Sequence, residues 1–199
     1  NMIVHPHGSA ARRPGTKFAM DTKFMDEPSR LIPFEFNTEQ AYIIEMGNNY
    51  MRFYKDNAII VESSSTPITA ITKANPGVVT ANGHNLSNGD YVVLGSVAGM
   101  SQINNVQFKV ANKTTNTFEL NTLDDDNFDT TNFDTYTSGG NVFKIYEIAS
   151  PYSSSDLQSI KFAQSADIMY LTHPSHGIRK LSRTGHTNWT LASVTITGS

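Results

Sequence analysis

The sequence contains no cysteine, which excludes disulfide bonds, thiolate zinc sites and cysteine nucleophiles. Charged residues are also sparse, at 17%, and the formal net charge is −3, so no basic field exists to attract nucleic acid or an anionic membrane. No apolar run approaches the roughly 20 residues that a membrane-spanning helix needs, and no signal peptide opens the chain. We therefore expect no membrane partner and at most a transient contact with DNA.

The residues that are abundant favour strands and turns. Ser, Thr and Asn dominate the polar positions, and their short side chains compete for backbone groups within helices. The hydrophobic fraction, 38%, suffices for a lean core. Because the first residue is Asn1 rather than Met, we expect a fragment or a processed product.

A meander of hairpins is predicted after residue 30. Residues 41–46 place Tyr42, Ile44 and Met46 on one face at the period of two that is typical of a strand. Turn signals follow at residues 47–49 and 55–57, and the patterns around them predict further strands at 50–54 and 58–61. No stretch predicts a long helix, so the expected fold class is all-β.

The middle of the chain has a different rhythm, and it predicts a separate small barrel. The run Ser63–Pro67 marks a boundary, and Ser138–Gly140 marks a second one. Between them, short strands separated by Asn- and Gly-rich turns suit a small barrel. The predicted strands are 68–72, 78–80, 91–94, 106–110 and 118–120.

The domain organisation that we predict has three parts. Residues 1–29, which contain three prolines, form an extended N-terminal arm. Residues 30–62 and 143–199 form a discontinuous region of propeller-blade-like antiparallel hairpins, and residues 63–142 form the inserted small β-barrel.

A loose repeat supports this division. At a constant offset of 128, the first meander aligns with a second one, as repeated blades of a β-propeller would. The aligned residues are Phe34, Asn37, Glu39, Tyr42 and Ile43 with Phe162, Ser165, Asp167, Tyr170 and Leu171, and then Arg52-Phe53 with Lys180-Leu181.

An ordered series of motifs resembles the N-terminal part of podophage tail nozzle proteins, also called tail tubular protein B. The motifs lie at residues 12–18, 39–44, 51–54, 150–157, 162–171 and 179–189. The inserted segment resembles a small β module of phage proteins that is related to the FCCH domain of ubiquitin-activating enzymes, on residues 71–76, 83–90 and 116–120. Ubiquitin chemistry does not follow, because the chain has no cysteine.

The resemblance implies a structural protein of the virion tail, made in the bacterial host cytoplasm. It implies a ring of identical subunits around the tail channel in the full-length protein, with an adaptor ring and fibres as partners. The alternative that we keep open is a carbohydrate-binding or adhesion module of a phage tail or cell-surface protein, which acts through the inserted segment.

No catalytic constellation emerges from the residues, so we expect no enzyme, no cofactor and no metal. No Gly-x-Ser-x-Gly elbow frames a serine, and Glu39 and Asp167 occupy equivalent repeat positions, which favours turn roles over a catalytic pair. The histidines at 5, 7, 173 and 176 fit loops better than a zinc site, and His84 fits a turn. The acidic loop Asp124–Asp126 lacks the spacing of an EF-hand, which leaves cation binding there open.

Interface candidates come from the N-terminal segment. Arg12 and Arg13 precede Pro14, which favours an extended backbone, and their guanidinium groups could clamp a carboxylate of a neighbouring subunit. Most of the aromatic residues fall on predicted strands, which favours the core over a ligand surface. This set is Phe34, Phe36, Tyr42, Phe53, Tyr54, Phe162, Tyr170 and Trp189.

Overall fold

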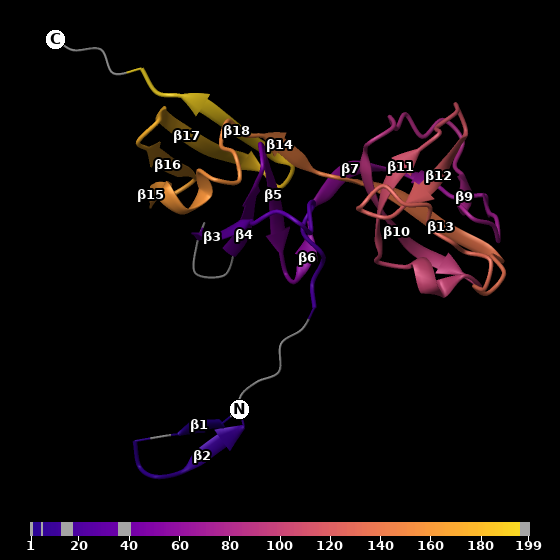
Figure 1. Ribbon diagram of the computed structural model, residues 1–199, viewed down its shortest axis with the longest axis horizontal. Coiled ribbons are helices and arrows are strands. Elements are labelled where there is room, and N and C mark those ends of the chain that lie inside the picture. Colours follow the sequence, from indigo (N-terminus) through magenta and orange to yellow (C-terminus); the bar gives the residue numbers. More distant parts are fainter. Residues whose placement is uncertain (1, 5, 13–17, 36–40, 196–199) are drawn as a thin grey trace.

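The computed structural model describes residues 2–4, 6–12, 18–35 and 41–195, which Figure 1 shows as labelled ribbons. Their regular structure is antiparallel β-sheet, apart from two short 3-10 helices, η1 (Ser101–Ile103) and η2 (Leu157–Ser159). The predicted all-β fold class is confirmed. Among these residues, no helix is long and apolar enough to cross a membrane.

The first sheet is the predicted meander. Its strands are β3 (Arg30–Glu35), β4 (Ala41–Gly47), β5 (Tyr50–Lys55), β6 (Ala58–Ile59) and β14 (Glu147–Ala149), in the order β14-β5-β4-β3 with β6 also on β5. Two-residue turns join β4 to β5 and β5 to β6, and Asn49, Asp56 and Asn57 take positive φ angles there. Asn and Asp tolerate this conformation, which is why these turns were readable from the sequence.

The second sheet is a simple four-stranded meander. Its strands are β15 (Lys161–Ser165), β16 (Ile168–His173), β17 (His176–Gly185) and β18 (Asn188–Ser193), paired in chain order. Pro174 and Ser175 form the two-residue turn between β16 and β17. His173 and His176, which the sequence assigns to a loop, flank this turn.

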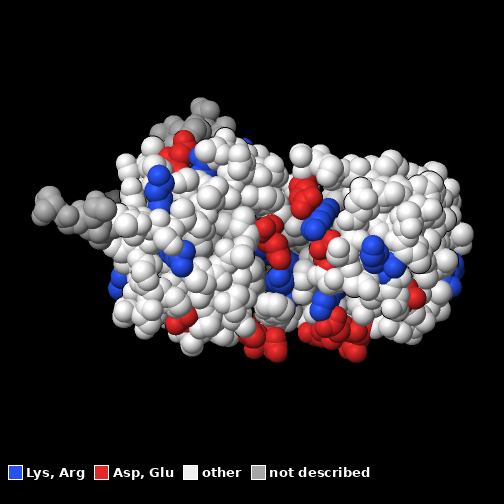
Figure 2. Space-filling view, turned by 90° about the horizontal axis from the view of Figure 1, so that it is seen from above, with Lys and Arg blue, Asp and Glu red and all other residues white. Residues whose placement is uncertain are grey.

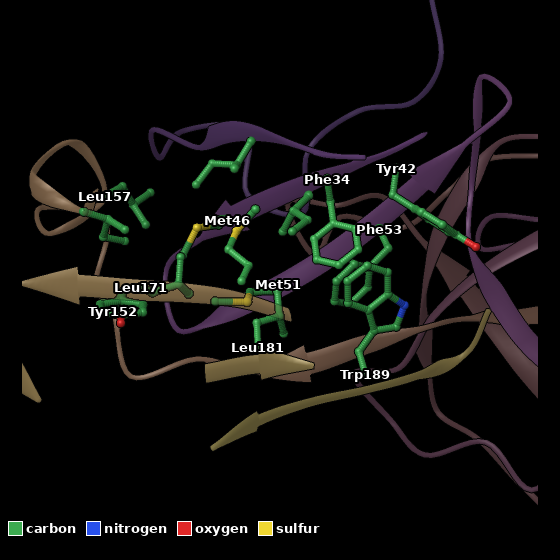
Figure 3. Close-up of a cluster of buried hydrophobic side chains, with 14 of the residues drawn as sticks. Phe34, Tyr42, Met46, Met51, Phe53, Tyr152, Leu157, Leu171, Leu181 and Trp189 are labelled. Atoms are coloured by element: carbon green, nitrogen blue, oxygen red, sulfur yellow. The ribbon is translucent and has the colours of Figure 1, made fainter. Parts of the chain in front are cut away.

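The two sheets pack face to face over one hydrophobic core (Figure 3). At its centre, the Trp189 indole stacks on Phe53 with ring centroids 4.2 Å apart, and it meets Phe34 and Tyr42 edge-on at 4.8 and 5.4 Å. Aromatic contacts of these kinds add to the free energy that burial of their area supplies. Because the stacked and edge-on rings come from both sheets, the sheets form a single folded unit.

The third sheet is the predicted barrel, in the order β7-β13-β10-β11-β12-β9-β8. Its strands are β7 (Val61–Pro67), β8 (Ala70–Ile71), β9 (Val78–Thr80), β10 (Tyr91–Ala98), β11 (Gln107–Ala111), β12 (Thr117–Asn121) and β13 (Ser138–Ile145). The two edge strands β7 and β8 are one continuous segment. Between them, Ile68 N–H donates to the Gly140 carbonyl at 2.9 Å and Thr69 N–H donates to the Thr80 carbonyl at 2.9 Å, which closes the sheet around its own core.

The barrel is inserted within one strand of the first sheet. Along β5, β6 pairs with residues 54–55, Ile60 N–H donates to the Phe53 carbonyl at 2.8 Å, and β14 pairs with residues 50–52. Residues 58–60 and 147–149 are therefore two halves of one edge strand. Tyr146 N–H donates to the Ile60 carbonyl at 3.0 Å, so the two ends of the insertion lie side by side.

The two segments predicted as boundaries lie within strands. Ser63–Pro67 lies in β7 and Ser138–Gly140 opens β13, and these two strands pair with each other. The central residues of β7 are exposed, and small hydroxyl side chains suit such a strand surface.

The prediction for residues 1–29 is also corrected. Within this segment, β1 (Met2–Val4) and β2 (Ala10–Arg12) form a short hairpin, with Gly8 at a φ of 83° between them. Figure 1 shows this hairpin apart from both cores. Residues further along the segment contact the rest of the molecule, since Met20 packs between the first sheet and the barrel.

The repeat holds for strand order and for the side-chain direction of Arg52-Phe53 and Lys180-Leu181, but not for the direction of side chains on β4 and β16. The offset of 128 aligns Tyr42 with Tyr170 and Ile43 with Leu171. However, Tyr42 and Leu171 are buried in the shared core, whereas Ile43 and Tyr170 are 39% and 42% exposed. A slip of one residue exchanges the two faces of a strand, so this alignment pairs inward with outward positions. Asn37 and Glu39 lie outside the described residues.

Candidate functional site

The barrel and the first sheet meet at a junction with a small apolar core. Ile59, Tyr91, Val93 and Ile145 are buried there. Figure 2 shows acidic and basic side chains gathered along the waist between the two lobes. We call the charged and hydrogen-bonding side chains beside this core the junction network. Its members are Lys23, Glu45, Tyr50, Arg52, Tyr54, Gln107 and Glu147.

Glu45 is the buried acid of the network. It sits on the outer face of β4 and has no solvent exposure. Its carboxylate accepts hydrogen bonds from the Tyr50 hydroxyl, from the Tyr54 hydroxyl at 2.5 Å and from the Lys23 backbone N–H at 3.3 Å. Three donors to one carboxylate replace the water that burial removes.

Arg52 is the buried base, directly opposite Glu45 on β5. Its Nε donates to Glu147 Oε2 at 3.0 Å, and its Nη1 donates to Gln107 Oε1 at 3.3 Å. The guanidinium carbon lies 4.6 Å from the centre of the Tyr91 ring. Since Gln107 and Tyr91 belong to the barrel, one arginine of the first sheet holds the barrel through both a polar and a cation–π contact.

Lys23 brings the N-terminal segment into the same network. Its Nζ lies 2.7 Å from Glu147 Oε1 and about 5.0 Å from the ring centres of Tyr50 and Tyr91. Glu147 thereby receives Lys23 on one oxygen and Arg52 on the other. With Glu45, the four side chains carry two positive and two negative charges, so the burial of charge is balanced.

The phenols of the network are fixed as donors. Burial raises the pKa of Tyr50 above its usual range, and so do the hydrogen bond that its hydroxyl donates to Glu45 and the negative charge of that carboxylate. Burial and then the same carboxylate raise the pKa of Tyr54 in the same way. Both hydroxyls therefore keep their protons and donate to Glu45 wherever the fold persists.

This arrangement links the N-terminal segment, the first sheet and the barrel. Its polar groups point at one another across the junction. Two of its buried nitrogens, Arg52 Nη2 and Gln107 Nε2, have no hydrogen-bond partner among the described residues. The sequence offered a signal that we did not use. Glu45 and Arg52 are charged residues inside otherwise apolar strands, at positions that hairpin pairing places opposite each other.

Of the predicted interface residues, the structure describes only the backbone of Arg12. The backbone of Arg12 pairs with Met2 in the N-terminal hairpin, and its side chain lies outside the described residues, as do Arg13 and Pro14. Their predicted role stays a prediction.

The acidic loop of the barrel has partners of its own. Asp125 pairs with Lys109 at 2.6 Å. Asp129 accepts hydrogen bonds from the hydroxyl and backbone N–H of Thr131, and these lower the pKa of its carboxyl group. Within the described ranges, these carboxylates do not converge on one point.

Two histidines on the second sheet do converge with a carboxylate. Asp156 lies beside His173 and His176, with ring nitrogens 3.6 and 3.0 Å from its oxygens. Hydrogen bonds from the Ser153 hydroxyl and backbone, and then from His176, lower the pKa of Asp156 to about 2. The two histidines lie close together in the sequence, but Asp156 lies 17 residues before His173, so no local pattern links it to them.

His84, His7 and His5 lie outside this cluster or outside the described residues. His84 is buried and accepts the Leu86 N–H on Nδ1 at 3.0 Å, so its Nε2–H faces the Thr117 carbonyl at 3.3 Å. This geometry confirms the predicted turn role. His7 is exposed, and His5 lies outside the described residues.

The aromatic prediction is confirmed for four residues and wrong for two. Phe34, Tyr42, Phe53 and Trp189 are buried in the core. In contrast, Phe162 and Tyr170 are 41% and 42% exposed, because Phe162 lies on the edge strand β15 and Tyr170 points away from the core. Tyr54 is half-buried at the junction, and Phe36 lies outside the described residues.

Comparison with known proteins assigns a likeness to the barrel alone. Residues 74–145 match the family of the ubiquitin-activating enzyme E1 FCCH domain, which is a small non-catalytic β module. The match runs from the segment before β9 to the end of β13. No curated protein matches the chain. The predicted FCCH-like character of the inserted segment is therefore confirmed, and this segment is similar to that domain.

Proposed function

We propose that the chain is part of a structural protein of a bacteriophage tail, of the nozzle class, that works through subunit interfaces and docking surfaces and not through catalysis. The observation that carries this proposal is the face-to-face packing of two blade-like sheets whose outer faces still carry exposed apolar side chains. Leu31 and Ile43 lie on the outer face of the first sheet, at 63% and 39% exposure, and Tyr170 lies on that of the second. Further blades or neighbouring subunits would cover these faces.

A groove on the first sheet supports an interface there. It has a volume of about 390 Å³ and is bounded by residues 19–22 on one side and the outer face of β3, β4 and β5 on the other. Apolar side chains such as Leu31 and Ile43 line it together with the charged residues Lys55 and Asp56. Apolar contact area combined with polar groups is the usual composition of a protein interface.

The junction network suits a mechanical role. A module inserted into an edge strand would swing if only two peptide links held it. The contacts of Arg52 with Gln107 and Tyr91 fix the orientation of the barrel against the sheet. In a tail protein, the barrel would then present a docking surface for an adaptor ring or a fibre at a fixed angle.

Electron microscopy and light scattering of the full-length protein test this proposal. We expect ring-shaped oligomers and smaller species when Ile43→Glu places a charge on the outer face. Ser64→Glu, an exposed position on the barrel, is the matched control and should leave the rings intact. Gold-labelled antibodies against the chain should mark the tails of virions. Particles that stay monomeric at high concentration, together with unlabelled virions, would contradict the proposal.

One observation favours the alternative of a carbohydrate-binding module. A pocket of about 340 Å³ on the barrel is lined by hydroxyl and amide groups, among them Ser64, Ser65 and Asn85. Sugar sites also use exposed aromatic faces, but the large exposed apolar side chains of the described residues all lie outside the barrel. Glycan-array binding that Asn85→Ala abolishes would promote this alternative over the structural role.

A further inference from the structure

The cluster of Asp156, His173 and His176 lies at one end of the second sheet, away from the junction network. His173 and His176 flank the two-residue turn between β16 and β17 and are directly opposed in register, so their side chains share one face. Their ring centres are 4.9 Å apart. Asp156 approaches this pair from the segment that leads into η2.

The geometry matches that of a metal site. His173 Nε2 lies 3.6 Å from Asp156 Oδ1, His176 Nε2 lies 3.0 Å from Oδ2, and the three ligand atoms all lie within 4.8 Å of one another. Zinc bonds of about 2.0–2.2 Å at tetrahedral angles place neighbouring ligand atoms roughly 3.3–3.5 Å apart. The 3.0 and 3.6 Å separations already lie near this spacing, so modest side-chain shifts would bring the three ligand atoms onto one ion.

The surroundings hold the ligands in place. Ser153 donates both its hydroxyl and its backbone N–H to Asp156 Oδ2, each at 2.8 Å. The buried ring of Tyr152 meets the His176 ring edge-on at 5.1 Å and forms one wall of the cluster. Support of this kind orients ligands in known metal sites.

We propose that Asp156, His173 and His176 bind a divalent transition metal ion of the Zn²⁺ type, with a fourth position left to water. Two imidazole nitrogens and one carboxylate oxygen suit Zn²⁺, Co²⁺ or Ni²⁺, whereas Ca²⁺ and Mg²⁺ require ligand sets made of oxygen. Three protein ligands leave one tetrahedral position open. The bound ion ties the β16–β17 turn to the segment before η2.

Binding is coupled to the turn. His173 Nδ1 accepts the Ser175 N–H at 3.1 Å, so in the neutral ring the proton is on Nε2 and faces Asp156. A metal on Nε2 requires that proton to move to Nδ1, and the Ser175 N–H must then release its acceptor. Ser175 is exposed, so water can replace the lost partner. The Ser175 amide is consequently a reporter of occupancy.

The test uses the untagged full chain, freed of metal with a chelator, and titrates it with Zn²⁺ by calorimetry and by amide NMR. We expect one ion per chain, a rise in the melting temperature and a shifted Ser175 amide signal. Co²⁺ should give the visible absorption bands of a tetrahedral site. Mg²⁺ should change neither the melting temperature nor the Ser175 signal.

Variants locate the site. His176→Gln and Asp156→Asn keep polar side chains and should each weaken Zn²⁺ binding by about 100-fold or more. His186→Gln, a histidine outside the cluster, and His7→Ala, in the N-terminal segment, should leave binding unchanged. Near-ultraviolet circular dichroism verifies that each variant is folded. The proposal is overturned if folded wild-type protein binds no Zn²⁺, or if His7→Ala removes the binding and His176→Gln does not.

Discussion

The two sheets of the core are both four-position antiparallel meanders, but they differ at the fourth strand position. In the second sheet, β18 is one continuous edge strand. In the first sheet, residues 58–60 and 147–149 share that position, and the whole barrel lies between them. An edge strand can accept such an insertion because only one of its sides is paired within the sheet, so the added chain leaves through solvent.

The difference reaches the outer faces of the sheets. Arg52 and Lys180 are equivalent in the repeat and both lie on outer faces, opposite Glu45 and Tyr170. Arg52 is fully buried beneath the barrel, whereas Lys180 stays partly exposed. The same strand position thus carries a buried ionic network in one sheet and an ordinary surface in the other.

Removal of the barrel should have the largest effect on the difference between the two sheets. Deletion of residues 61–146, with Ile60 joined to Glu147, should restore a continuous fourth strand like β18. We expect a folded two-sheet core, and we expect residues 61–146 to fold alone around their own apolar cluster. Urea unfolding followed by tryptophan fluorescence reports on the two-sheet core alone, because Trp189 is the single tryptophan of the chain and lies in that core.

The control for that deletion is a cut at the boundaries that the sequence predicted. Deletion of residues 63–142 leaves residues 61–62 of β7 and 143–145 of β13 attached, and of the pairs that joined the two strands only Val61 with Ile145 remains. This variant should aggregate or unfold at lower urea than the 61–146 deletion. Equal stability of the two variants would contradict the assignment of one interrupted strand.

Trp189→Ala tests whether the sheets share one core. The indole contacts three aromatic rings of the first sheet, although Trp189 belongs to the second. The substitution should lower the free energy of unfolding by about 5 kcal/mol, from lost burial, the cavity left behind and lost aromatic pairing. Circular dichroism should show both sheets melting early while the barrel persists. Loss of the second sheet alone would contradict a shared core.

Arg52→Ala tests the junction network. It removes the partner of Gln107 and one of the two cationic partners of Glu147. We expect a loss of about 3 kcal/mol, the lower end for a broken buried pair, because Glu147 is 32% exposed. The matched variant Lys180→Ala should change stability by less than about 0.5 kcal/mol. Urea unfolding measures both, and similar losses would show that burial under the barrel does not set the difference.

Sequence patterns predicted what depends on neighbours along the chain. Period-two alternation found β4, and Asn- or Asp-rich pairs found the turns that follow β4 and β5. These signals are local because turn residues must tolerate positive φ. The centre of the barrel was readable for the same reason, since Gly- and Asn-rich turns separate its strands.

What sequence patterns could not predict depends on tertiary contacts. Whether Ser63–Pro67 forms a linker or a strand is decided by β13, which lies far along the chain. Whether the Tyr170 side chain points into the core or away from it depends on the strand register to within one residue, which composition does not encode. Similarly, Asp156 meets His176 only because a turn before η2 folds back on the β16–β17 hairpin.

The smallest effect on stability is expected from the cluster of Asp156, His173 and His176 on the second sheet. This cluster is partly exposed, whereas Glu45 and Arg52 of the junction network are buried. The pKa of Asp156 is lowered from 3.8 to about 2, so its ionised form stabilises the fold above pH 4, and this contribution disappears as the pH falls to 2. Asp156→Asn should therefore lower stability at pH 6 and match the wild type near pH 2. Urea midpoints across this range measure the convergence, with Asp134→Asn as the exposed control. A gap that persists at pH 2 would assign the stabilisation to packing instead of to the charge of Asp156.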